Sequence, residues 1–564
     1  MNYIESYNSW LNNPLVDDQT KQELLSIKDN DEEIKDRFYQ TLAFGTAGLR
    51  GKLGAGTNRM NKYIVGKATQ GIADFIKTQG PTYMAKGVVI AHDCRHFSKE
   101  FAQYVAEIMA ANGIKAYLFE DLRPTPELSY AILQLKAACG INVTASHNPK
   151  EYNGYKVYWE DGAQVLSKVA DPMTELIQKV DAFAGVKAID LKQGVAQGLI
   201  EIIGQAMDDK YIELVKSLSI YDDKDLDKDV KVVYTPLNGC GAVPVQRVLR
   251  ERGFKNIYVV KEQEQPDPDF TTVGYPNPED PKAFAYAERL GKETDATILV
   301  ATDPDSDRLA IEVKDENGKY IPFNGNQTGF ILIKYIVEGL SKTNKLPENP
   351  ALVKSIVTGD LGAIIAKDYG VKCFESLTGF KNICGRIPFL KANNYNYVFG
   401  YEESIGYAAS SQVMDKDGVS AAMLLVEAAA FYQKQNKSLL DVREELYQQY
   451  GYFKEDQISL VLEGIAGSER IKRMMVNYRQ DYIQDFAGIK VKEAIDFLHG
   501  YEDIPASNVL KFRLTDDSWY AVRPSGTEPK IKLYIYTSDK SEAKAVEKLE
   551  LIKRLVLAKL NSIK

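Results

Sequence analysis

In the segment INVTASHNPK, residues 141–150, an apolar run stops at a turn of small residues, and a serine and a histidine then follow in succession. Three interpretations are open for Ser146: a turn residue whose neighbours cap the next element, the nucleophile of a Ser-His-Asp hydrolase, or a hydroxyl exposed at the carboxyl end of a strand, where it could carry a transferred group. The hydrolase is the weakest, because G-x-S-x-G is absent and His147 is poorly placed to take its neighbour's proton. Lys156, in the segment EYNGYKVYW that follows, is close enough in sequence to return to the same site as an acid or a base.

A second segment, ATDPDSDRLA, places three carboxylates at alternate positions directly after an apolar strand. In extended backbone alternate side chains share a face, so we expect Asp303, Asp305 and Asp307 to converge. Three like charges at one point are unfavourable unless a cation neutralises them, and oxygen ligands favour Mg²⁺, Mn²⁺ or Ca²⁺. A solvated acidic loop is the poorer alternative, because an apolar strand leads into the segment. The segment ATDPDSDRLA therefore predicts a binding site for one divalent ion.

A third segment, RPSGTEPKIK, gathers an arginine, two hydroxyls, a glycine and lysines within one turn, residues 523–532. Arginine pairs bidentately with phosphate, and glycine lets backbone N–H groups approach an anion. An ordinary hairpin turn is the alternative. The chain contains neither G-x-x-x-x-G-K-[ST] nor an intact G-x-G-x-x-G, so the phosphate site that we expect is not a nucleotide-phosphate loop.

Two further segments are weaker alone. FGTAGLRG is a glycine-rich loop that holds Arg50, and GYEESIGY places Glu402, Glu403 and Ser404 after a strand. Carboxylates accept hydrogen bonds and could bind sugar hydroxyls, although a solvated turn is also open.

The elements that must position these segments alternate between apolar strands and helical patterns along most of the chain. Such alternation predicts α/β layers with parallel strands. The segments that carry it are residues 87–93, 98–113, 114–120, 229–239, 242–254, 256–262, 295–307, 325–340 and 351–360. Residues 508–537 instead read as alternating strands around polar turns, and a long helical pattern follows at 541–561, which predicts a smaller α+β domain.

Size and composition exclude several classes of protein. A chain of 564 residues is too long for one ordinary core, so several domains are expected. The net charge of −8 argues against a general nucleic-acid binder. We find no signal peptide and no run of about 18 apolar residues, so no membrane partner is expected. The five cysteines lie in no C-x-x-C pair, which predicts free thiols and a cytoplasmic protein.

Together these motifs resemble the α-D-phosphohexomutase superfamily, the phosphoglucomutase and phosphomannomutase enzymes. TASHNP is similar to its phosphoserine loop, DPDSDR to its metal loop, GYEES to its sugar-binding loop and RPSGTEPK to its phosphate-binding loop, in the family's order. The resemblance spans nearly the whole chain. It implies four domains around a central cleft, three α/β domains with mixed or parallel sheets and a smaller C-terminal α+β domain. We expect them at residues 1–206, 207–321, 322–452 and 453–564.

The resemblance also implies roles for individual residues. Ser146 would be the phosphoserine and would hold one Mg²⁺ together with Asp303, Asp305 and Asp307. The implied catalytic residues are Ser146, Lys156, Arg50 and Arg308. The implied substrate-binding residues are Thr46, His147, Lys381, Glu402, Ser404, Arg523, Ser525, Gly526 and Thr527. One departure is Asn238 in TPLNG, where the family often has histidine.

The activity implied is the interconversion of sugar 1-phosphate and 6-phosphate, first of all glucose phosphates, through a phosphoserine enzyme and a bisphosphorylated sugar. A sugar 1,6-bisphosphate would be the activator. GYEESIGY resembles a branch that includes bacterial phosphoglucomutases and animal phosphopentomutases, so phosphopentomutase or phosphomannomutase activity is an alternative. A Mg²⁺-dependent phosphatase of the haloacid-dehalogenase type would leave Ser146 and Arg523 without a role. A non-enzymatic sugar-phosphate binding protein is the last alternative.

Overall fold

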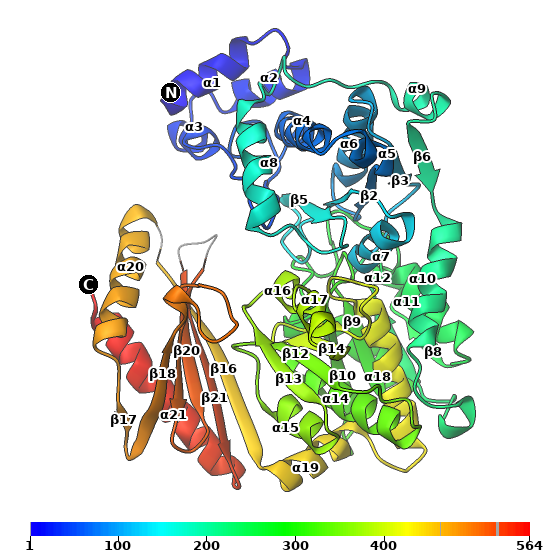
Figure 1. The fold of residues 1–564 in the computed structure, drawn as a ribbon, viewed down its shortest axis with the longest axis vertical. Helices are drawn as coiled ribbons and strands as arrows, with labels where there is room; N and C mark the ends of the chain where they lie inside the picture. The colour runs from blue at the N-terminus through cyan, green and yellow to red at the C-terminus, as the bar shows by residue number, and fades with distance from the viewer. Residues whose placement is uncertain (1, 463, 526–529) are drawn as a thin grey trace.

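The computed structural model describes residues 2–462, 464–525 and 530–564, and it contains four β-sheets that follow one another along the chain. We name domains I to IV after these sheets. Figure 1 shows domain I in blue and cyan at the top, domains II and III below it in green and yellow, and domain IV in orange and red at the left. Among the described residues, no helix is both long and apolar enough to span a membrane.

Domain I has a six-stranded mixed sheet in the order β1-β5-β4-β2-β3-β6. Strands β2, β3, β4 and β6 are parallel, whereas β1 and β5 are antiparallel to their neighbours. All five residues of β2 and of β4 are buried, as expected of central strands that are covered on both faces. The strands are β1 Leu49–Lys52, β2 Val88–His92, β3 Ala116–Phe119, β4 Cys139–Val143, β5 Tyr152–Trp159 and β6 Ile200–Ile203. The helices are α1 Tyr3–Asn12, α2 Asp18–Ser26, α3 Asp31–Phe38, α4 Lys62–Thr78, α5 Pro81–Lys86, α6 Ser98–Ala111, α7 Thr125–Leu135, α8 Ser167–Lys179 and α9 Leu191–Ala196.

Domain II has a five-stranded sheet in the order β11-β10-β9-β7-β8. Strands β7, β8 and β9 are parallel, and β10 and β11 run antiparallel at one edge. The strands are β7 Val232–Thr235, β8 Ile257–Val259, β9 Ile298–Thr302, β10 Leu309–Lys314 and β11 Tyr320–Phe323. The helices, two of them 3₁₀, are α10 Gln205–Ser217, η1 Asp223–Asp225, α11 Ala242–Glu251, α12 Lys261–Glu264, η2 Pro281–Phe284 and α13 Ala285–Thr294.

Domain III repeats the pattern with the order β13-β12-β14-β15, in which only β15 is antiparallel. The strands are β12 Pro350–Ser355, β13 Lys372–Ser376, β14 Asn396–Glu402 and β15 Gly406–Ala408. The helices are α14 Gly325–Lys342, α15 Leu361–Asp368, α16 Phe380–Cys384, α17 Ile387–Ala392, α18 Gly418–Gln433 and α19 Leu439–Tyr450.

Domain IV has an antiparallel sheet in the order β16-β21-β20-β19-β18-β17, with two long helices. The α+β character expected of the C-terminal part is confirmed. The strands are β16 Tyr452–Val461, β17 Asp485–Phe486, β18 Ile489–Asp496, β19 Leu510–Leu514, β20 Trp519–Pro524 and β21 Lys530–Asp539. The helices are α20 Gly464–Gln480, η3 Phe497–His499 and α21 Glu542–Ser562.

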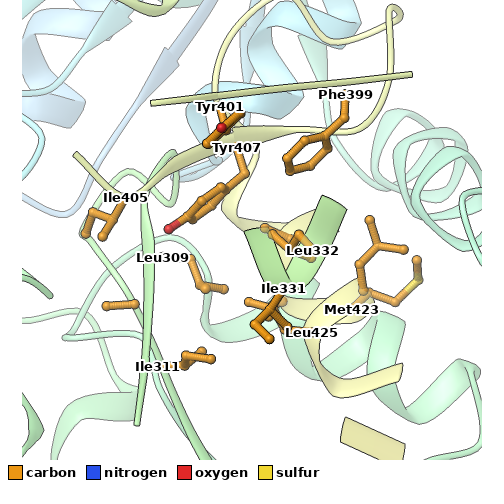
Figure 2. Close-up of a cluster of buried hydrophobic side chains, with 14 of the residues drawn as sticks. Leu309, Ile311, Ile331, Leu332, Phe399, Tyr401, Ile405, Tyr407, Met423 and Leu425 are labelled. Carbon is orange, nitrogen blue, oxygen red and sulfur yellow. The ribbon is translucent and has the colours of Figure 1, made fainter. Parts of the chain in front are cut away.

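One hydrophobic core runs through domains II and III and extends to residues of domains I and IV, and part of it is shown in Figure 2. Leu309 and Ile311 of β10 pack in the same cluster as Ile331 of α14 and Tyr407 of β15. Helix α18, which contributes Leu425 and is buried along almost its whole length, contacts α10, α11 and β9 of domain II as well as α14. This core fixes the strand ends of domain II against those of domain III.

The antiparallel strands differ from the parallel layers that alternation predicts, and the connections explain why. A parallel crossover needs a dozen or more residues. Only residues 144–151 join β4 to β5, residues 303–308 join β9 to β10, and residues 403–405 join β14 to β15. Each connection is too short to cross over, so the chain turns back. These three turns carry three of the four motifs found in the sequence.

Candidate active site

Three hairpin loops meet at the site. We call residues 144–151 the serine loop, residues 303–308 the acidic loop and residues 403–405 the glutamate loop. The hydroxyl of Ser146 donates to Asp303 Oδ2 at 2.7 Å, which joins the first two loops. The backbone N–H of Leu309, the residue directly after the acidic loop, donates to the carbonyl of Ile405 at 3.2 Å and so connects the last two loops. The site therefore combines domains I, II and III.

Ser146 is buried, with 3% of its surface exposed, and not exposed as the strand-end position suggests. The acidic loop explains the difference, because Asp303 contacts the hydroxyl directly. The residue has a left-handed backbone, with φ of 52°, and its N–H donates to Thr144 Oγ1 at 2.9 Å. His147 Nδ1 lies 3.2 Å from the hydroxyl. Burial, followed by the charges of Arg308 and Arg50, lowers the pKa of His147 well below its usual value, so the ring is neutral.

The three aspartates of the acidic loop converge, as the sequence predicts. One carboxylate oxygen of each lies within 4.8 Å of the others, and all three residues are buried. Extended backbone is not the reason. Ser306 has a φ of 53° and its N–H donates to the carbonyl of Asp303 at 2.9 Å, so a tight turn gathers the side chains.

Two carboxylate oxygens of the acidic loop could bind a cation. Oδ1 of Asp305 and Oδ1 of Asp307 are buried and make no hydrogen bond within the described part of the chain. Buried polar atoms without partners are rare in folded proteins and call for an explanation such as an ion. A donor set of carboxylate oxygens fits Mg²⁺, Mn²⁺ or Ca²⁺ and suits Zn²⁺ less well.

Two buried lysines balance part of this negative charge. Lys156 Nζ lies 2.7 Å from Asp305 Oδ2 and 3.3 Å from Asp307 Oδ2. Burial alone would lower the pKa of Lys156, but the two carboxylates raise it, so the side chain is an ammonium. Lys416 Nζ lies 3.0 Å from Asp307 Oδ2 and 3.2 Å from Asp415 Oδ1.

Lys416 was not predicted from the sequence, although it lies in the short charged segment MDKDG between apolar residues. Thr125, which begins α7 and donates to Asp305 Oδ2 at 2.8 Å, was not predicted either. Asn142 of β4 in turn donates to Thr125 Oγ1 at 2.7 Å. Through these two hydrogen bonds, strand β4 and helix α7 of domain I fix the carboxylate of Asp305.

Arg308 connects the acidic loop to the glutamate loop. Its N–H donates to Asp303 Oδ1 at 3.0 Å, its backbone forms a bridge with Gly406, and its Nη1 lies 3.5 Å from the carbonyl of Ser404. Glu402, the last residue of β14, is 6% exposed and accepts from the N–H of Gly379 at 3.3 Å. Burial and the neighbouring carboxylate of Glu403 raise the pKa of Glu402 to about 7.

Three other predicted residues lie around this group. Lys381 of α16 donates to the carbonyl of Thr46 at 3.3 Å, so domain III contacts the glycine-rich loop of domain I. Arg50 of β1 donates to Asn148 Oδ1 of the serine loop at 3.2 Å. The glycine-rich loop FGTAGLRG, which alone was a weak indication of a functional site, therefore lies beside the serine loop.

The fourth motif lies in domain IV. Arg523 is near the end of β20, opposite Lys532 of β21, and the N–H of Ser525 donates to the carbonyl of Lys530 at 2.8 Å. Figure 1 shows the end of β20 and the start of β21 directed toward domain I. The structure brings Arg523 and Ser525 together in this turn but does not join them to Ser146 by any described hydrogen bond. Gly526 and Thr527 lie outside the described residues.

The chain matches four models of one family, each in the expected order. The α/β/α domains I, II and III of phosphoglucomutase/phosphomannomutase match residues 41–183, 209–318 and 324–450, and the C-terminal domain matches residues 475–551. The phosphoglucomutase of Staphylococcus epidermidis is 36% identical over 545 residues, 94% of this chain and 96% of that protein. A phosphoglucomutase of Staphylococcus aureus is 37% identical over 516 residues, 89% of this chain and 91% of that protein.

Solved structures share the fold. Parafusin, a phosphoglucomutase from Paramecium in its open form, aligns with a TM-score of 0.71 at 19% identity and covers 93% of this chain and 95% of its own. A phosphoglucomutase/phosphomannomutase family protein from Burkholderia thailandensis aligns with a TM-score of 0.67 at 20% identity, over 92% of this chain and 98% of its own.

Proposed function

Because the chain belongs to the phosphoglucomutase/phosphomannomutase family and is a phosphosugar mutase, we propose that it interconverts α-D-glucose 1-phosphate and glucose 6-phosphate. Ser146 carries the phosphoryl group, and a bisphosphorylated sugar is the intermediate. A sugar 1,6-bisphosphate primes the serine and so acts as the activator. Phosphopentomutase or phosphomannomutase activity in the same scaffold is the alternative, and the choice of glucose rests on the names of the relatives in two Staphylococcus species.

The single observation that carries this proposal is the 2.7 Å hydrogen bond from the Ser146 hydroxyl to Asp303, within a buried group of three aspartates. A serine with its own acidic cluster and a nearby ammonium is suited to hold a phosphoryl group. Phosphoryl transfer depends mostly on positioning and on neutralising charge. A haloacid-dehalogenase phosphatase would instead use one of the aspartates as nucleophile and would leave the serine without a role.

Asp303, Asp305 and Asp307 would hold one Mg²⁺ together with the phosphorylated Ser146, and the buried carboxylate oxygens that make no hydrogen bond within the described residues support this assignment. When bound, the ion supplies positive charge beside the phosphoryl oxygens. Lys156 neutralises a further part of the negative charge, since its ammonium contacts Asp305 and Asp307. The same ammonium is the candidate acid for the sugar oxygen.

The remaining residues bind and orient the sugar phosphate. Glu402 and Ser404 receive the sugar hydroxyls, while Thr46, His147 and Lys381 contact the substrate around the serine loop. Arg50 and Arg308 add positive charge beside the transferred group. Arg523 and Ser525, with Gly526 and Thr527, bind the phosphate that does not react. This clamp must accept either phosphate in turn, because the bisphosphate has to turn round between the two transfers.

In our proposal the four domains comprise residues 1–206, 207–321, 322–452 and 453–564, close to the limits of the matched family models.

We also propose a cytoplasmic location, because all five cysteines are free thiols, as is usual in a reducing compartment. Its partners are small phosphosugars, with no nucleic acid and no membrane.

A panel of substrates tests the proposed function. Purified enzyme with Mg²⁺ and a trace of glucose 1,6-bisphosphate is given the 1-phosphates of glucose, mannose, N-acetylglucosamine, ribose and deoxyribose. The highest kcat/KM is expected with glucose 1-phosphate. A pentose phosphate with a higher kcat/KM would move the assignment to the phosphopentomutase alternative. Release of inorganic phosphate in place of isomerisation would support a phosphatase, and binding without turnover would support a binding protein.

A further inference from the structure

Arg95, in the segment AHDCRH at the end of β2, donates hydrogen bonds to backbone carbonyls in and directly after the serine loop. Its Nη2 donates to the carbonyl of Ser146 at 2.6 Å and to that of Asn148 at 2.5 Å. Its Nη1 donates to the carbonyls of Pro149 and Tyr152 at 2.9 and 3.1 Å. One guanidinium group therefore satisfies four backbone carbonyls, which only a planar fork with several N–H donors can do.

The guanidinium is itself fixed on two sides. Nε lies 3.1 Å from Asp93 Oδ2, and both side chains are completely buried. The ring of Phe270, from domain II, lies 5.0 Å from the guanidinium carbon. The same stretch of domain II, residues 265–280, also reaches the outside of the serine loop, where Asp269 pairs with Lys150 at 3.1 Å. The serine loop thus lies between a buried cation of domain I and a loop of domain II.

This arrangement accounts for the unusual backbone of Ser146. A left-handed conformation costs a residue other than glycine roughly 1–2 kcal/mol and persists only where the surroundings enforce it. The carbonyl of Ser146 is held by Arg95 and its N–H by Thr144. With the peptide groups on both sides of Ser146 fixed, the direction of the Cα–Cβ bond is set, and the hydroxyl can then reach Asp303.

We propose that Arg95 is a positioning residue for phosphoryl transfer, which sets the direction of the Ser146 hydroxyl through three carbonyls of the serine loop and that of Tyr152 at the start of β5. The inference rests on the proposed function. Arg95 contacts backbone oxygens and Asp93, so it acts through the loop and not on the transferred group. Displacing a reacting atom by about 1 Å lowers turnover on the order of a hundredfold. Loss of Arg95 should therefore reduce kcat and leave substrate and metal affinity largely intact.

The test compares Arg95→Ala and Arg95→Lys with the full-length wild-type enzyme. Arg59→Ala is the matched control, because Arg59 is a buried arginine of domain I whose side chain pairs with Asp36 and makes no described hydrogen bond to the serine loop. Four quantities are measured: kcat, KM for glucose 1-phosphate, Mn²⁺ affinity of the dephosphorylated enzyme, and the rate at which glucose 1,6-bisphosphate phosphorylates Ser146, followed by intact mass.

For Arg95→Ala we expect kcat and the phosphorylation rate to fall by about a hundredfold. KM and Mn²⁺ affinity should stay within about threefold of the wild-type values, as judged against Arg59→Ala. Added guanidinium chloride, at concentrations below those that unfold the enzyme, should restore part of the lost kcat of Arg95→Ala and none of that of Ser146→Ala. Arg95→Lys keeps the charge without the fork and should also lose kcat, by roughly tenfold.

Two results would overturn the proposal while the mutase function stands. One is an Arg95→Lys enzyme with wild-type kcat and phosphorylation rate, which shows that the fork is not needed. The other is a parallel loss of kcat, Mn²⁺ affinity and thermal stability without rescue by guanidinium, which shows a purely structural role. Arg95→Lys keeps the test decisive if Arg95→Ala does not fold. A wild-type enzyme without isomerase activity would instead refute the proposed function.

Discussion

The hydroxyl of Ser146 and the carboxylate of Asp303 are 2.7 Å apart although 157 positions separate them in the sequence. Ser146 lies in a hairpin of domain I and Asp303 in a hairpin of domain II. Asp303 directly follows β9, and Ser146 lies three residues after the end of β4, so both lie at the ends of buried parallel strands. The contact therefore depends on how two domains pack and not on either loop alone. Both loops must keep their shape for the site to exist.

Replacing Asp305 with Asn should weaken the binding of Mg²⁺ or Mn²⁺ by about tenfold to a hundredfold, because a neutral amide is a poorer ligand than a carboxylate. The affinity can be measured with Mn²⁺ by electron paramagnetic resonance. Glu316→Gln, on an exposed turn of the same domain, is the control. Full activity of chelator-treated wild-type enzyme without added metal would refute the metal assignment itself.

Replacing Lys416 with Met should destabilise the chain by about 3–5 kcal/mol, because Asp307 and Asp415 would lose a buried cationic partner. A bound divalent cation should compensate for part of the loss. We therefore expect added Mg²⁺ to raise the melting temperature of the variant more than that of the wild type. Lys437→Met, a more exposed lysine paired with Glu445, is the control. Equal responses to Mg²⁺ would show that Lys416 does not share charge with the site.

Because of the buried carboxyl of Glu312, we expect the free energy of unfolding to depend on pH. Burial and the nearby Glu288 raise the pKa of this carboxyl to about 7, and its Oε2 makes no hydrogen bond within the described residues. In the unfolded chain the pKa returns to about 4.3. Between these values the folded chain binds a proton that the unfolded chain does not. The contribution of protonated Glu312 to the free energy of unfolding is therefore fully present at low pH. It is lost as pH rises through about 7.

The variant Glu312→Gln stays neutral at every pH, so it should lack this dependence. From about pH 5 to pH 8 the free energy of unfolding of the wild type should fall relative to the variant, by up to about 3 kcal/mol. Urea unfolding at several pH values, with Glu316→Gln as the control, measures the difference. A wild type that gains stability relative to the variant over this range would contradict the prediction.

Replacing Arg523 with Ala should remove a charge-assisted hydrogen bond to phosphate worth about 1.5–3 kcal/mol. The corresponding loss in kcat/KM is roughly tenfold to hundredfold. Equilibrium fixes the ratio of forward and reverse kcat/KM, so the loss should be equal for the 1- and 6-phosphates. More bisphosphate should escape during turnover. Arg479→Ala, on α20 of the same domain, is the control, and an Arg523→Ala enzyme with wild-type kinetics would remove this residue from the clamp.

Much of the fold follows from local patterns. The run at residues 87–93 alternates with a helical pattern at 98–113, and β2 and α6 lie there. Such patterns report burial on one face or both, so they locate elements well. They do not tell which elements pack together. Helix α18 is apolar all round, and nothing in its sequence indicates that it joins the cores of domains II and III.

The site was predictable to the extent that it lies in compact motifs. Three aspartates at alternate positions suffice to predict a cation site, but the turn at Ser306 that gathers them was not predicted. Lys416 was missed because its partner Asp307 lies far away in the sequence, and a lysine in a charged segment reads as solvated. The burial of Ser146 was missed for the same reason, since a loop of another domain covers it.

The most direct test of the account is where the phosphate goes. The enzyme is incubated with glucose 1,6-bisphosphate and examined by intact mass and by peptide mapping, and the labelled enzyme is then offered glucose 1-phosphate. We predict one acid-stable phosphate on Ser146 that is passed on to the sugar, and a Ser146→Ala enzyme that neither gains phosphate nor turns over. An acid-stable phosphate on another residue, a labile acyl phosphate on Asp303, or near-normal turnover by Ser146→Ala would contradict the account.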